Sequence, residues 1–172
     1  MKPARVVVLL NASAGAIERE GPDKLRGILE AAFAKQGISA RLNFLKGADL
    51  HSGAERALQR ATRGEIDAII ASGGDGSIRT VAGVLADSGV PLGVIPLGTL
   101  NHFAKDLNIP ISVDEAVGVI AAGETRLVDV GEVNGHIFIN NSSIGIYPYL
   151  VLDRERQRRR QGPSGPPWLW LA

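Results

Sequence analysis

Residues 66–77 read IDAIIASGGDGS, an apolar run that passes directly into a loop of three glycines, an aspartate and a serine. The β-branched and aliphatic residues of the run are typical of a strand buried on both faces of a sheet. Glycines lack a Cβ, so the loop's backbone N–H groups are free to approach a ligand closely. A helix expected to begin near Ser77 adds its positive end at the same place. The stretch therefore predicts a parallel sheet with a phosphate-binding loop where a strand ends.

Strands and helices alternate on both sides of this stretch. The predicted strands cover residues 5–10, 38–44, 66–72 and 91–96, and the predicted helices follow them at about 25–36, 52–61, 77–85 and 112–121. Ser52 with Glu55, and Ser112 with Glu115, have the spacing of helix caps. This alternation predicts an α/β fold with a parallel sheet flanked by helices on both faces.

The pattern changes after residue 123. Residues 125–143 read TRLVDVGEVNGHIFINNSS, and Asn134–Gly135 at their centre is a strong signal for a hairpin between two antiparallel strands. We therefore expect a nucleotide-binding domain over residues 1–122. Residues 123–172 are then the beginning of a truncated β-rich second domain with a basic, Gly/Pro-rich tail.

Composition excludes several classes of protein. The chain has 172 residues and a net charge of +1, but residues 154–172 hold five Arg and one Glu, so the remainder is acidic and does not suit a nucleic acid. It has no cysteine, and its three widely spaced histidines form no evident metal site. No signal peptide or membrane-spanning run is evident, so a cytoplasmic protein is expected.

Three loops of unusual composition follow predicted strands, at residues 11–15, 73–77 and 97–101. Asp75 would repel bound phosphates unless it holds a divalent cation or accepts a proton, which favours Mg²⁺–nucleotide chemistry. The structural alternative is a tight turn in which Asp75 caps the following helix. Neither a G-x-x-x-x-G-K-[ST] loop nor a G-x-G-x-x-G helix start is present, which argues against a P-loop ATPase or an ordinary Rossmann dehydrogenase.

Together the three loops resemble the catalytic domain of the diacylglycerol kinase family, which includes bacterial lipid kinases and sphingosine kinases. The matching motifs are NASAG at residues 11–15, GGDGS at 73–77 and PLGTLNHFAKDL at 96–107. The resemblance covers roughly residues 5–150. NAD kinases and phosphofructokinases also carry Gly-Gly-Asp-Gly, but the third motif fits the lipid kinases better.

The resemblance implies a kinase that uses ATP and Mg²⁺ to phosphorylate a lipid hydroxyl, as in diacylglycerol. It places around the nucleotide the residues Asn11, Ser13, Gly15, Asn43, Gly73, Gly74, Asp75, Gly76, Ser77 and Thr99. It makes Asp75 the catalytic and metal-binding residue, and puts Asn101 and His102 on the acceptor side. Each has a structural alternative: Asn11 and Ser13 as turn residues, Asn43 as an exposed strand end, Thr99 as a local cap and His102 as a surface histidine.

The sequence departs from the family pattern at several positions. Ala12 replaces the usual Pro, Ser77 replaces Thr, Arg79–Thr80 replaces Asn–Glu and His102 replaces Asp. The family's second domain supplies the general base, and only its opening is recognisable here. The alternatives are therefore a kinase for a soluble acceptor such as NAD, or a nucleotide-binding module without catalysis.

The end of the sequence bears on partners. RERQRRR, residues 154–160, suits either a peripheral contact with anionic lipid headgroups or a solvated helix face. Trp168 and Trp170 suit either an interfacial anchor or domain surface. The expected partners are ATP and a lipid acceptor without nucleic acid, and a homodimer is left open.

Overall fold

The computed structural model describes residues 2–13, 20–143, 149 and 153. The chain divides into two compact units, residues 1–140 and 141–172, and every element named below lies in the first. In chain order the elements are β1 (Arg5–Asn11), α2 (Pro22–Lys35), β2 (Ser39–Leu45), the 3₁₀ helix η1 (Gly47–Asp49), α3 (Leu50–Thr62), β3 (Ala68–Gly73), α4 (Asp75–Leu85), β4 (Leu92–Pro96), α5 (His102–Asp106), α6 (Val113–Ala122), β5 (Gly131–Val133) and β6 (His136–Phe138).

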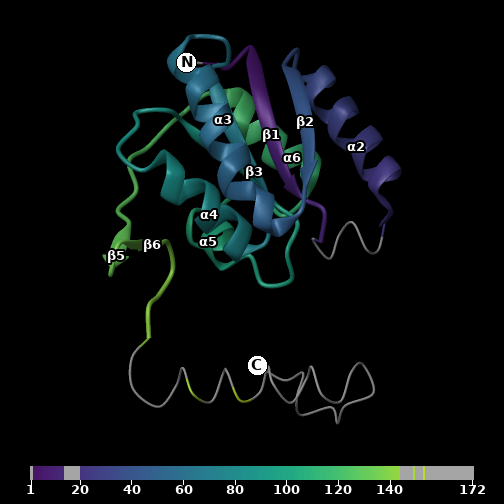
Figure 1. Cartoon of the computed structure of the whole chain (residues 1–172). Helices are drawn as coiled ribbons and strands as arrows, with labels where there is room; N and C mark the ends of the chain where they lie inside the picture. The colour runs from purple at the N-terminus through teal and green to yellow at the C-terminus, as the bar shows by residue number, and fades with distance from the viewer. Residues whose placement is uncertain (1, 14–19, 144–148, 150–152, 154–172) are drawn as a thin grey trace. The chain divides into compact units, whose positions relative to one another are not determined.

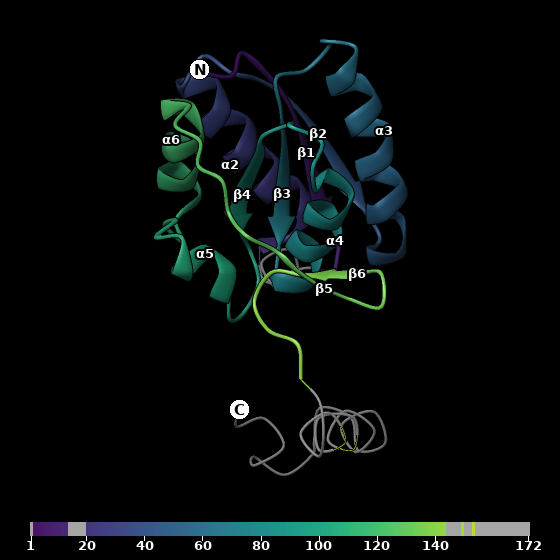
Figure 2. The ribbon, with the colours of Figure 1, turned by 90° about the vertical axis from the view of Figure 1, so that its left-hand side faces the viewer.

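The four long strands form one parallel sheet in the order β2-β1-β3-β4. Helices α2 and α6 cover one face, and α3 and α4 cover the other (Figures 1 and 2). The predicted α/β fold with a parallel sheet flanked by helices is confirmed. All four strands therefore end at the same edge of the sheet.

The continuous apolar runs are explained by burial on both faces of the sheet. In β1, Val6, Val8 and Leu10 pack toward α2 and α6, whereas Val7 and Leu9 pack toward α3 and α4. Residues of a strand alternate between faces, so a strand covered on both faces needs apolar residues at every position.

The predicted hairpin is present. β5 and β6 pair antiparallel, and Asn134 and Gly135 between them have φ of 51° and 76°, as a type I′ turn requires. β6 packs on α4, where Ile137 lies beside Gly83. The domain boundary at residue 123 stays a prediction.

Of the two predicted caps, the one at Ser52 is wrong and the one at Ser112 is correct in position only. Ser52 does not open a helix, because α3 already begins at Leu50 after the turn η1, and the Ser52 hydroxyl donates to the Asp49 carbonyl at 3.1 Å within the helix. Ser112 does occupy the N-cap position of α6, but its side chain makes no capping hydrogen bond. Burial of Leu50, which is 2% exposed, is the packing contact that favours the earlier start of α3.

Some predictions fall outside the described residues. Gly15, the basic segment 154–160, Trp168 and Trp170 all lie there. Among the helices that the structure describes, none combines the length and the apolar character needed to cross a membrane.

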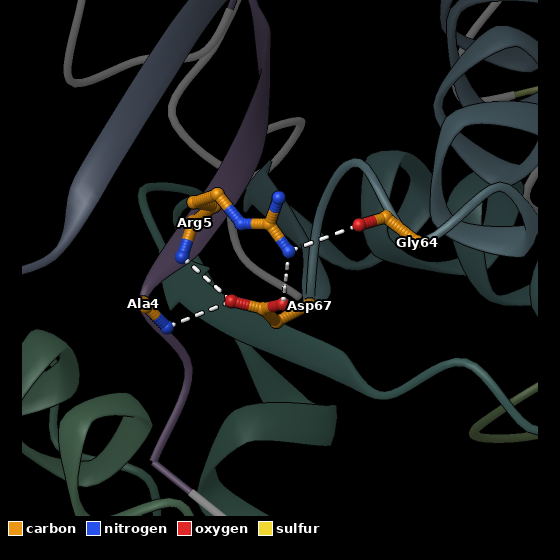
Figure 3. A network of polar contacts seen from close by, with 4 residues as sticks. All are labelled: Ala4, Arg5, Gly64 and Asp67. Carbon is orange, nitrogen blue, oxygen red and sulfur yellow. Dashed lines mark hydrogen bonds and ion pairs between the residues drawn. The ribbon is translucent and has the colours of Figure 1, made fainter.

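A polar network joins the amino ends of β1 and β3 (Figure 3). It lies at the edge of the sheet opposite the carboxyl ends of the strands. The Asp67 carboxylate accepts the backbone N–H groups of Ala4 and Arg5, each at 2.8 Å. The Arg5 guanidinium donates to Asp67 at 3.1 Å and to the Gly64 carbonyl at 2.9 Å. The N–H groups of Arg5 and Ala4, and then the Arg5 guanidinium, hold the pKa of Asp67 below its usual value.

Replacing Asp67 by Asn is expected to lower the free energy of unfolding by about 1 kcal/mol at pH 7, because hydrogen bonds to a carboxylate are lost while solvent around the half-exposed Arg5 screens the charge. The native pKa is lowered, so this stabilisation is complete above the ordinary value of 3.8 and is lost as pH falls through the native value. Urea unfolding from pH 7 to pH 3 measures it. Asp106→Asn, at the end of α5, is the control and should not show this pH dependence. If Asp67→Asn lowers the free energy of unfolding by the same amount at every pH, the assignment is contradicted.

Candidate functional site

A cleft of about 410 Å³ lies where β1, β3 and β4 end. Its described lining residues are Asn11, Ser13, Gly47, Leu50, Gly74, Gly76, Ser77, Thr80, Gly98 and Thr99. None of them carries a charge, and four are glycines. Six were predicted as site residues, so the structure brings the three predicted loops together at one cleft.

The β3–α4 junction places backbone donors at the cleft. Helix α4 begins at Asp75 with Gly74 as its N-cap, two residues earlier than predicted. The N–H groups of Asp75 and Gly76 belong to the first turn, which an α-helix leaves without intrahelical acceptors. Gly73 has φ of 153°, and a Cβ there would lie 2.9 Å from Ser77, so this bend requires glycine.

The loops after β3 and β4 touch through their backbones. A Cβ added at Gly98 would lie 2.4 Å from the Gly74 Cα, closer than any side chain allows. The Leu97 N–H donates to the Gly73 carbonyl at 2.9 Å, so the pairing of β3 with β4 continues into this contact. One wall of the cleft is therefore two glycine backbones in direct contact.

Asn11 crosses from the end of β1 to α4. Its Nδ2 donates to the Ser77 hydroxyl at 2.9 Å, and its Oδ1 accepts the Ser13 N–H at 3.0 Å. The contact fixes the Ser77 side chain, which is 7% exposed, at the floor of the cleft. Asn11 thus closes a turn, as its structural alternative holds, and also lines the cleft.

Asn101 closes the β4–α5 loop on itself. Its Oδ1 accepts the Gly98 N–H and its Nδ2 donates to the Gly98 carbonyl, both at 2.9 Å. The residue is 2% exposed and has the left-handed backbone conformation, with φ of 53° and ψ of 45°. Its amide is therefore engaged with the loop that holds Thr99. The predicted acceptor contact of Asn101 stays a prediction.

Asp75 does not line the cleft. Its two carboxylate oxygens accept the backbone N–H groups of His102 at 3.1 Å and Phe103 at 3.0 Å, the first residues of α5. The alternative in which Asp75 caps its own helix is wrong, because Gly74 is the N-cap of α4 and Asp75 makes no such bond. Sequence spacing gave no sign of this contact, which spans 27 residues.

Asn43 and His102 lie away from the cleft lining. Asn43 pairs with Leu9 within the β1–β2 ladder, two positions before β2 ends. His102 is exposed, and its contact with Asp75 is made by its backbone. Their proposed contacts with nucleotide and acceptor stay predictions.

Four lining residues were not predicted: Gly47, Leu50, Thr80 and Gly98. Thr80 lies one turn after Gly76 on α4, and its hydroxyl donates to the Gly76 carbonyl at 2.9 Å. Its spacing of four residues from Gly76 in a predicted helix could have placed it at the cleft. Gly47 and Leu50 come from the β2–α3 connection, whose place beside β1 depends on the strand order. No sequence signal identified them.

The described residues contain no group of three or more His, Asp or Glu side chains able to hold a metal ion. The carboxylate of Asp75, the predicted metal ligand, faces the first N–H groups of α5, and the described part of the cleft lining has no acid. These described residues do not form a Mg²⁺ site held by several protein side chains. The predicted catalytic and metal-binding roles of Asp75 stay predictions.

Comparison with known proteins identifies relatives for most of the chain. The model of the diacylglycerol kinase catalytic domain matches residues 5–133. A Staphylococcus epidermidis protein named diacylglycerol kinase is 34% identical over 146 residues, which cover 84% of this chain and 44% of that protein. A Yersinia pestis protein named "Probable lipid kinase YegS-like" is 39% identical over 100 residues, which cover 55% of this chain and 34% of that protein.

A solved structure has the same arrangement. The crystal structure of a diacylglycerol kinase from Bacillus anthracis str. Sterne superposes with a TM-score of 0.63 and 25% sequence identity. The match covers 95% of this chain and 52% of that one. The matches thus span about a third to a half of the length of these relatives.

Proposed function

Because the chain belongs to the diacylglycerol kinase catalytic domain family, we propose that its cleft binds the phosphates of ATP and that it transfers the γ-phosphoryl group to a lipid hydroxyl, as in diacylglycerol. One observation carries the proposal: the cleft is walled by the Gly74–Gly98 backbone contact and receives the first turn of α4. Glycine backbone and a helix N-terminus together suit a bound phosphate.

The chemistry asked of this cleft is positioning. Phosphoryl transfer requires the donor and acceptor oxygens in line and the developing charge stabilised, with little covalent chemistry by the protein. The first-turn N–H groups of α4 would stabilise phosphate oxygens, and the hydroxyls of Ser77 and Thr99 would donate to them. The mutually fixed loops would hold the phosphate chain in one orientation.

Mg²⁺ enters the proposal with the nucleotide. It commonly binds through substrate phosphates with one or two carboxylates. No acid lines the described part of the cleft, so we derive no step through the metal. A cytoplasmic location with peripheral contact with an anionic membrane belongs to the same proposal, because a lipid acceptor would be reached there.

The experiment measures phosphate transfer from γ-labelled ATP with Mg²⁺, either to diacylglycerol in mixed micelles or to NAD. We expect label on the lipid, and ATP–Mg²⁺ should raise the melting temperature by about 5–10 °C, since saturation at about 100 times Kd stabilises by about 2.7 kcal/mol. Label on NAD alone would establish the soluble-acceptor alternative. Stabilisation without transfer would establish a binding module, and no stabilisation would refute both.

Gly76→Ala tests whether phosphate approaches this backbone. Among the described residues outside its own helix backbone and chain neighbours, a Cβ at Gly76 meets no atom within 4 Å. Ala also favours the helix, so the free energy of unfolding should be unchanged or slightly higher. Its methyl group would enter the cleft, and ATP affinity measured by calorimetry should fall at least tenfold. The control Gly118→Ala, in α6, has equally open space and should leave affinity unchanged. Equal ATP affinity in Gly76→Ala and the native protein would show that the ligand binds elsewhere.

A further inference from the structure

The start of α5 is capped by a side chain from another element. The first N–H groups of a helix need acceptors, which the N-cap side chain ordinarily supplies. In α5 the acceptors are the two carboxylate oxygens of Asp75, which bind the N–H groups of His102 and Phe103. A carboxylate is also the favoured charge at this end of a helix.

The N-cap residue itself, Asn101, is committed elsewhere. Its left-handed backbone turns its side chain back to Gly98, where both amide groups are used. Asn101 makes no capping bond to α5. Asp75 and Asn101 thus divide two tasks: Asp75 holds the helix, and Asn101 holds the loop before it.

These contacts lead to the cleft wall. Gly98 and Thr99 line the cleft and lie between β4 and the α5 start that Asp75 holds. On the other side, Gly74 lies against Gly98 and immediately precedes Asp75. α5 is anchored by Phe103 and Ala104, which are buried against the α3–α4 face. The β3–α4 loop therefore meets the β4–α5 loop at two places: Gly74 contacts Gly98, and Asp75 binds the end of that loop where α5 begins.

We propose that Asp75 is a positioning residue: its carboxylate fixes the start of α5 and, through it, the Gly98–Thr99 wall of the cleft, without binding the metal. The effect on nucleotide binding rests on the proposed function. The hydrogen bonds from Asp75 to α5 do not depend on the proposed function. The effect on α5 and the effect on nucleotide binding can therefore be tested separately.

The first experiment needs no nucleotide. In Asp75→Ala, amide exchange at His102 and Phe103 should accelerate at least tenfold by NMR, and the amide resonances of Gly98 and Thr99 should shift. Asp75→Asn keeps one acceptor oxygen and should retain part of the protection. Asp114→Asn, which removes an acid from the first turn of α6, is the control and should change none of these signals. Unchanged exchange in Asp75→Ala overturns the proposal, whether or not ATP binds.

The second experiment separates positioning from metal binding. ATP affinity should fall about tenfold in Asp75→Ala and recover to within about threefold of the native value in Asp75→Asn. The Mg²⁺ concentration for half-maximal ATP binding should stay within twofold of the native value in Asp75→Asn. A tenfold rise in that concentration would make Asp75 a metal ligand and overturn the proposal. If the native protein binds no ATP, the proposed function fails, and amide exchange alone decides the role of Asp75 at α5.

Discussion

Gly98→Ala should destabilise the protein by about 3 kcal/mol and weaken ATP binding at least thirtyfold. The added Cβ would lie 2.4 Å from the Gly74 Cα and 2.8 Å from the Asn101 Oδ1, and the nearest atom is backbone that cannot rotate away. Overpacking of this kind typically costs about 1–3 kcal/mol, and this contact is among the closest possible. The loops must separate, which moves Gly98 and Thr99 at the cleft. Urea unfolding and calorimetry with ATP–Mg²⁺ measure the two effects.

Alanine at the other glycine of the same contact, Gly74, is the control. A Cβ at Gly74 would lie 3.4 Å from the Gly98 Cα, which is nearly ordinary van der Waals contact. Gly74→Ala should cost about 0.5–1 kcal/mol, mostly because Ala is a poor N-cap residue. If the two alanine variants are equally stable, the loops are not in the tight backbone contact described above.

Asn101→Ala should destabilise the protein by about 3 kcal/mol. Two hydrogen bonds to Gly98 are lost, each worth about 1 kcal/mol, and Ala must adopt the left-handed conformation at about 1–2 kcal/mol. Asn101→Gly loses the same hydrogen bonds without the backbone strain, so it should be about 1 kcal/mol more stable than Asn101→Ala. Urea midpoints for the two variants measure this difference. If both variants cost less than 0.5 kcal/mol, the Asn101–Gly98 hydrogen bonds do not stabilise the loop.

The sheet and the hairpin were predictable because their signals are local. The central residues of a strand buried on both faces are apolar, and residues 6–10 of β1 and 68–71 of β3 show this directly. Asn134–Gly135 fixes its turn through the φ values that these two residues readily adopt. Such features depend on neighbours in sequence, so the sequence alone sufficed.

The helix starts and the role of Asp75 were not predictable in this way. The Ser52–Glu55 pattern fits a cap, but α3 begins at the buried Leu50, a choice that depends on packing against the sheet. The bond from Asp75 to α5 depends on β3 lying next to β4, which no local pattern encodes. The sequence placed the Asp75 loop correctly at the end of β3, but only the structure shows that its carboxylate accepts the N–H groups of His102 and Phe103.

The backbone contact between Gly74 and Gly98 has a consequence for ligand entropy. Loops that order only when a ligand arrives subtract their lost conformational freedom from the binding free energy. Here the pairing of Leu97 with Gly73, the Gly74–Gly98 contact and the hydrogen bonds to Asp75 and Asn101 restrict both loops in the unliganded protein. The conformational entropy of this wall is therefore lost when the protein folds rather than when a ligand binds. A ligand meets a surface that is already in place.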